Sequence, residues 1–187
     1  RVYAEAKRAG REREFYMFHL GHPEISARYN PIGNFSRVTE VATRIAGQLP
    51  SEGQSAAFKE FVWRFVNVMA RALVALGRKP GYEHFSRYAA NVEPLLVDYF
   101  EHWLDREPQA AGWRVEVAGL EIDNTRLDKA LKSRGGELVK LLDYAKRKQL
   151  YDSTASALAS VVTYENSYFQ KLVASLYPFL EKVTTGE

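Results

Sequence analysis

The sequence predicts a mainly α-helical protein: a multi-helix bundle preceded by one helix and one strand. Beyond residue 35, apolar residues recur at spacings of three and four over most of the chain, and glycine and proline interrupt that pattern. Strand-like alternation is confined to short segments. Hydrophobic residues make up 46% and aromatic residues 13% of the 187 residues. These fractions fit a folded domain with a real core and argue against disorder.

The first 35 residues differ from the rest. A basic helix is expected over Arg1–Arg13, a strand over Phe15–Leu20, and a polar loop that ends in Tyr29–Asn34. A single strand cannot satisfy its own backbone hydrogen bonds. The chain also begins with Arg rather than Met, so we expect a piece of a longer protein. The orphan strand is then expected to pair with another copy, to pack against the helices or to be poorly ordered.

Three helical segments are expected in the first half. The first runs from Ser36, as N-cap, to about Leu49. The second, Ser55–Leu76, has the broadest apolar stripe and ends at Gly77, a natural C-terminal cap. The third stretch, Tyr82–Trp103, contains Pro94, so it divides near Asn91–Glu93 and places the proline at the first position of a new helix.

In the second half, two longer helices are predicted, Asn124–Gln149 and Ser153–Tyr177. Gly135 and Gly136 divide or kink the former, and Pro178 lies near the end of the latter. The region from Glu107 to Asp123 is ambiguous, because its segment 113–117 alternates like a strand but also fits an extended loop.

The residues indicate no catalytic, cofactor or metal site, and hence no enzymatic activity in this segment. There is no cysteine, no GxxxxGK[ST] loop and no GxGxxG motif. The four histidines lack HExxH or HxxxH spacing. His19 and His22, three residues apart around a turn, would suit a metal, but a lone pair of this kind is more often structural.

The candidate DNA- or partner-binding residues are basic. The net charge of +3 is mild and permits contact with nucleic acid. The candidates recur along the predicted helix 124–149 and are Arg126, Lys129, Lys132, Arg134, Lys140, Lys146, Arg147 and Lys148. They would contact phosphates or an acidic partner. Alternatively, the last of them interact with the helix C-terminal dipole and with solvent, and interleaved acidic residues dilute the charge.

The segment from Phe15 to Leu104 resembles the coupling proteins of bacterial conjugation and type IV secretion, the TraD/TraG-type ATPases. It is most similar to the TraD branch found on integrative conjugative elements. The resemblance is carried by an ordered set of segments: Phe15–Leu20, Tyr29-Asn30-Pro31-Ile32-Gly33, Val41–Ala46 and Ser55–Trp63, followed by an aromatic-rich helix.

In that family an all-alpha domain grows out of a hexameric, RecA-like motor domain and returns to it. The resemblance therefore implies that residues 1–35 are a residual helix, strand and loop of a truncated α/β motor domain. Residues 36–180 would be the all-alpha insertion domain, and residues 181–187 a tail leading back to the motor. ATP and magnesium are expected only in the missing motor domain.

The function implied by the resemblance is substrate recognition. The domain would engage the transferred DNA, the relaxase or other relaxosome proteins, or a secreted protein, and deliver it to the motor and the type IV secretion channel. The full-length parent would be an ATP-driven translocase at the cytoplasmic face of the bacterial inner membrane. The segment itself is expected to be soluble and a monomer or weak dimer. The alternative is a structural element that organises motor-subunit assembly without direct substrate contact.

Overall fold

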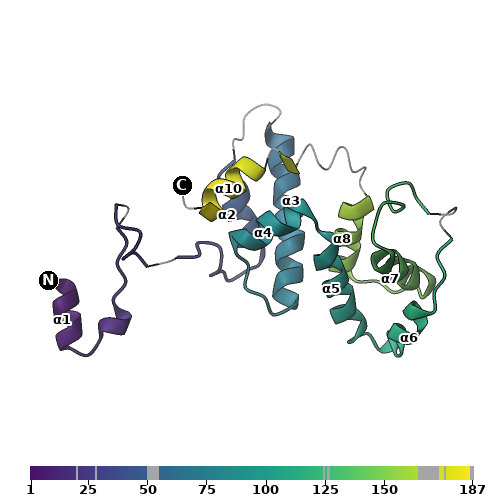
Figure 1. The fold of residues 1–187 in the computed structure, drawn as a ribbon, viewed down its shortest axis with the longest axis horizontal. Coiled ribbons are helices and arrows are strands. Elements are labelled where there is room, and N and C mark those ends of the chain that lie inside the picture. Colours follow the sequence, from purple (N-terminus) through teal and green to yellow (C-terminus); the bar gives the residue numbers. More distant parts are fainter. Residues whose placement is uncertain are drawn as a thin grey trace. The chain divides into compact units, whose positions relative to one another are not determined.

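The computed structural model describes residues 1–19, 21–27, 29–49, 55–123, 125, 127–163, 173–174 and 176–185. The chain divides into two compact units, Arg1–Pro31 and Ile32–Glu187. The described residues are mainly helical and contain no β-strand (Figure 1). The prediction of a mainly α-helical fold is confirmed, and the prediction of a strand is wrong for the part of that segment that the structure describes.

The first unit consists of short helices and turns. Helix α1 (Val2–Arg8) is followed by the 3-10 helix η1 (Glu12–Glu14), so the basic helix expected over Arg1–Arg13 is broken. Gly10 explains the break, because its φ of +66° is a left-handed conformation that glycine adopts without strain. Residues 15–19 belong to no regular element, since no described neighbour supplies a strand to pair with; residue 20 lies outside the described part.

The second unit begins with α2 (Thr39–Ala46), three residues later than the predicted start. The expected N-cap, Ser36, is not the cap; instead Glu40 accepts the N–H of Arg37 at 3.1 Å from within the first turn. This contact lies one residue before the N-cap position, which Val38 occupies without a side-chain cap. Val41, Ala42, Ile45 and Ala46 are buried, as the apolar spacing requires.

Helix α3 (Ser55–Ala75) matches the predicted second helix. Its last turn closes with the N–H of Gly77 on the carbonyl of Val74 at 2.9 Å and the N–H of Arg78 on that of Leu73 at 2.8 Å. Gly77 has φ +71°, so this is a Schellman-type end at the predicted glycine cap. The indole Nε1 of Trp63 donates to Thr43 Oγ1 at 3.1 Å and ties α3 to α2.

The predicted division of the third helical stretch is confirmed. Helix α4 (Tyr82–Ala90) ends before Asn91, and α5 (Glu93–Leu104) begins with Pro94 in its first turn. There the missing N–H of proline costs no helical hydrogen bond. Asn91 Oδ1 accepts the N–H of Glu93 at 3.1 Å and helps to start the new helix.

The ambiguous region forms the 3-10 helix η2 (Pro108–Ala110) and helix α6 (Trp113–Ala118), so a strand or extended loop over 113–117 is wrong. Five residues fit either period, but their burial follows the helical one. Trp113 and Val117, one turn apart, are 6% and 7% exposed, whereas Val115 between them is 80% exposed.

The glycine pair 135–136 marks a helix start. Helix α7 (Gly136–Arg147) begins there, whereas the described residues of 125–134 form turns and irregular backbone rather than the predicted helix. Helix α8 (Ser153–Thr163) is capped by Asp152, whose Oδ1 accepts the N–H groups of Thr154 and Ala155 at 2.8 Å. The predicted continuation over 164–172 lies outside the described residues. Pro178 falls in the first turn of α10 (Tyr177–Thr185), so it starts a helix instead of ending one.

The helices of the second unit share one hydrophobic core. Helix α3 lies at its centre: α2 and α4 contact it, α5 and α8 contact it elsewhere, and α10 packs on α4 (Figure 1). Helix α5 also contacts α7 and α8, and α6 packs on α7. Among the largest fully buried side chains are Phe85, Met69, Leu95 and Tyr144. Within the described residues, no helix has the length and apolar character needed to cross a bilayer.

Candidate functional site

The predicted basic residues do not form one helical face. Lys129 and Lys132 lie in the turns before α7, and Arg134 lies just before its start. Lys140, Lys146 and Arg147 belong to α7, and Lys148 is its C-terminal cap residue. Arg126 lies outside the described residues. The first four candidates were expected on the same helix as the rest. The described part of the loop that carries them is not helical, so it does not align them with α7.

Arg134 forms its contacts inside the second unit. Its Nη1 forms an ion pair with Oε1 of Glu93 on α5 at 3.0 Å, and its Nη2 donates to the carbonyl of Val162 on α8 at 3.1 Å. The side chains of Arg134 and Glu93 are 13% and 20% exposed. Oε2 of Glu93 also accepts the N–H of Gly135 at 3.2 Å. Arg134 therefore fixes the start of α7 against two other helices.

Two lysines connect α7 to α6. Nζ of Lys140 donates to the carbonyl of Ala118, the last residue of α6, at 3.1 Å. Nζ of Lys148 lies 2.7 Å from Oε2 of Glu116 and 5.7 Å from the ring centre of Tyr144. The hydrogen bond that Lys148 donates to Glu116 raises the pKa of Lys148 above its usual value. Both lysines thus serve the packing of α6 on α7.

The remaining candidates differ in whether they form an ion pair. Nε of Arg147 forms an i,i+4 ion pair with Oδ2 of Asp143 at 2.7 Å, although the arginine side chain stays 59% exposed. Lys129, Lys132 and Lys146 are exposed, and none of them has an ion pair with another described residue. These three lysines, at the loop and the outer end of α7, are called the open lysines below.

A cleft of about 320 Å³ lies between α7 and the preceding loop. Leu127, Leu131 and Leu142 are among its apolar lining residues, and Lys146 and Arg147 are its basic ones. Its acidic lining residues are Glu121, Asp123, Asp128 and Asp143. Because carboxylates outnumber cations in this lining, the cleft itself disfavours a phosphate.

A polar cluster that sequence reasoning missed joins α5 to α6. Oδ2 of Asp105 accepts from Nη2 of Arg114 at 2.9 Å, and its Oδ1 accepts from the indole Nε1 of Trp113 at 3.0 Å. The guanidinium of Arg114 lies 4.5 Å from the ring centre of Trp113. The hydrogen bond from Arg114, followed by that from Trp113, lowers the pKa of Asp105 to about 2. The helical form of residues 113–118 brings these groups together, whereas the sequence had left a strand and an extended loop open for 113–117.

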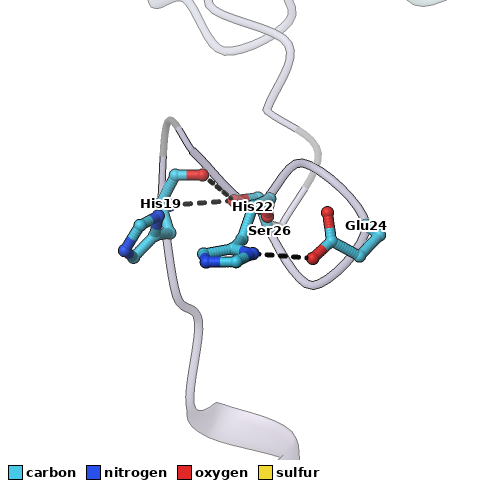
Figure 2. Close-up of polar contacts among 4 residues, drawn as sticks. All are labelled: His19, His22, Glu24 and Ser26. Atoms are coloured by element: carbon cyan, nitrogen blue, oxygen red, sulfur yellow. Dashed lines mark hydrogen bonds and ion pairs between the residues drawn. The ribbon is translucent and has the colours of Figure 1, made fainter.

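The two histidines that the sequence singled out lie close together in the first unit (Figure 2). The ring centres of His19 and His22 are 4.7 Å apart, and Nδ1 of His22 lies 2.9 Å from Oε1 of Glu24. Ser26 holds the turn: its hydroxyl accepts the N–H of His19 at 2.8 Å and reaches the carbonyls of His19 and His22 at 2.9 and 3.0 Å. Among the described residues, no group of three or more potential ligands is arranged to hold a metal ion. The histidine pair therefore has local hydrogen bonding as its visible role.

Comparisons with protein-family models, with curated proteins and with solved structures find no match to this chain. The similarity to TraD/TraG-type coupling proteins accordingly stays a prediction from the sequence.

Proposed function

We propose that this chain is a non-catalytic substrate-recognition segment of a conjugative coupling ATPase of the TraD/TraG type. Its second unit engages transferred DNA or a relaxosome or secreted protein, and delivers it to a motor domain and a type IV secretion channel. The first unit belongs to that RecA-like, hexameric motor, which supplies ATP hydrolysis and magnesium binding at the cytoplasmic face of the inner membrane.

The observation that carries the proposal is the division of the basic residues into two groups. Arg134, Lys140 and Lys148 hold α7 in place through contacts with α5, α8 and α6. The open lysines, by contrast, are exposed, and the described residues give them no ion-pair partner. The last turn of α7 and the turns that precede this helix present these lysines, and such a surface is suitable for phosphates or for an acidic partner.

A structural role in motor-subunit assembly remains the second candidate, and a specific observation favours it. Several of the basic residues expected to meet a substrate are already used within the chain. In that case the helical unit sets the spacing between motor subunits, and the open lysines are merely solvated.

The test is salt-dependent binding of labelled single- and double-stranded DNA, measured by fluorescence anisotropy. Charge reversal of all three open lysines (K129E/K132E/K146E) should weaken DNA binding. The slope of log K against log salt should fall by about 0.9 for each duplex phosphate that the variant no longer neutralises, hence by up to about three.

The matched control reverses three exposed lysines elsewhere, K7E/K79E/K182E, which changes the net charge equally. It should alter the affinity less and leave most of the slope intact. Equal effects of the two triple variants would mean that only net charge matters. If neither DNA nor an acidic relaxosome protein binds the unaltered chain, substrate recognition fails and the structural alternative stands.

A further inference from the structure

Within residues 15–19, Met17 and His19 form hydrogen bonds to the returning segment 26–27. The carbonyl of Met17 accepts the N–H of Ala27 at 2.7 Å, and the N–H of His19 donates to Ser26 Oγ at 2.8 Å. Residues 17 and 19 thus direct polar groups towards the returning segment 26–27. Phe15 has φ −90° and ψ 118°, which is extended backbone. In extended chain, alternate residues direct their N–H and C=O groups to opposite sides.

The C=O of Met17 and the N–H of His19, two residues apart, both reach segment 26–27, which is the alternation of an extended chain. We infer from it that the backbone groups of Tyr16 and Phe18 face the other side. The N–H and C=O groups of both residues lack a hydrogen-bond partner among the described residues. Their side chains are also exposed, at 72% for Tyr16 and 64% for Phe18. A row of open donors and acceptors between exposed aromatic side chains is a pairing edge.

The spacing of the open groups makes this edge complementary to itself. In an antiparallel pair with Met17 opposite Met17 of a second copy, Tyr16 of each chain lies opposite Phe18 of the other. Both facing pairs are then hydrogen-bonded pairs, which use all of the open N–H and C=O groups of Tyr16 and Phe18 in both copies. Met17 is the central non-hydrogen-bonded pair, which agrees with its carbonyl being occupied by Ala27.

We propose that two copies of this chain associate through antiparallel pairing of residues 16–18, with Met17 on the two-fold axis. An isologous contact of this kind closes on itself, so it gives a dimer and not a fibre. Each copy adds a Tyr16–Phe18 aromatic pair across the strands, a combination that stabilises antiparallel sheets. The site lies in the first unit and does not depend on the function proposed for the second.

Disulfide trapping tests the register directly, because the natural sequence has no cysteine. M17C places two thiols across a non-hydrogen-bonded pair, where Cα atoms are about 4.5 Å apart, close to the range that a disulfide spans. We expect M17C to form a covalent dimer under mild oxidation at least tenfold faster than Y16C. An equimolar mixture of Y16C and F18C should link as a heterodimer, since those positions face each other.

Sedimentation equilibrium of the cysteine-free chain provides the second measurement. Its weight-average mass should rise above 21.3 kDa as the concentration increases. The variant F18P removes an open N–H from each copy and should raise the dissociation constant at least about tenfold. Because this N–H has no described partner within the chain, helical content should stay unchanged by circular dichroism.

Either of two results overturns the proposal. The first is a mass that stays at that of the monomer at all concentrations while M17C links no faster than Y16C. The second is a concentration-dependent dimer in which Y16C links to itself as readily as M17C, because that register would leave the open groups unmatched.

Discussion

The two units of this chain differ in how far they bury similar apolar side chains. In the first unit, α1 and η1 bury no residue, and Tyr3, Tyr16 and Phe18 are more than half exposed. In the second, Phe85 and Leu95 are fully buried in a core shared by several helices. Local hydrogen bonds shape the first unit, whereas apolar packing between distant segments holds the second.

The difference shows what each unit can do by itself. A core of buried side chains stabilises its helices in a way that short-range hydrogen bonds do not, because isolated short helices are marginal in water. The first unit leaves apolar side chains such as Tyr16 and Phe18 exposed.

The largest effect is expected from truncating a core aromatic residue. F85A removes a ring that is 0% exposed, so it should lower the free energy of unfolding by about 3–5 kcal/mol. The counterpart F18A, in the first unit, should change it by less than about 0.5 kcal/mol. Urea unfolding followed by circular dichroism, at a concentration too low for association, measures both. Similar losses for the two variants would show that the first unit shares the stability of the second.

Removing an ion pair should likewise cost more stability in the second unit than in the first, although both losses should be smaller than that of F85A. R134A leaves Glu93 partly buried without its cation and should cost about 2–3 kcal/mol, below the range for a fully buried pair. R11A removes an ion pair to Glu14 at 2.6 Å whose side chains are 68% and 63% exposed, and should cost less than about 0.5 kcal/mol.

A double-mutant cycle checks the origin of the larger loss. If R134A acts through Glu93, then R134A and E93Q together should cost clearly less than the sum of the single variants. Additive losses would instead assign the effect of Arg134 to its packing and to its bond with the carbonyl of Val162.

Much of the fold could be predicted because the signals for it are local. The apolar stripe of α3, the glycine cap at Gly77 and the division before Pro94 each depend on a few neighbouring residues. The wrong predictions needed distant partners. Residues 113–117 fit two periods, and in their helical form Trp113 and Val117 are buried and α6 contacts α7, which is distant in the sequence. The predicted strand needed a sheet that the described residues do not supply.

The basic site was harder to predict, because sequence gives the charge of a residue but not its partners. Glu93 and Arg134 are far apart in the chain, and so are Glu116 and Lys148. Nothing local distinguishes Arg134 or Lys148 from the open Lys132. The Asp105 cluster was missed for the same reason, since its geometry requires the correct conformation of residues 113–118.

The smallest effect is a pH dependence of the free energy of unfolding. It is expected from the ion pair of Asp105 and Arg114, which is exposed like the ion pairs of the first unit. The hydrogen bond from Arg114 is the largest cause of the lowering of the Asp105 pKa to about 2 from its ordinary 3.8. The folded state therefore favours the ionised carboxyl, and this contribution is fully present above about pH 4. It should disappear as the pH falls from about 4 through about 2, because the carboxyl then binds a proton less readily in the folded chain than in the unfolded one.

Unfolding by urea at several pH values between 4 and 2 measures this change. D105N and R114Q should both flatten the pH dependence, since the first removes the titrating group and the second removes the main cause of its shift. Parallel curves for the unaltered chain and both variants would contradict the expectation. If only D105N flattens the curve, the bond from Trp113 must carry the effect. A flattening by both variants would show that an exposed ion pair contributes to stability when a neighbouring helix fixes its partners. The exposed ion pairs of the first unit lack such a helix.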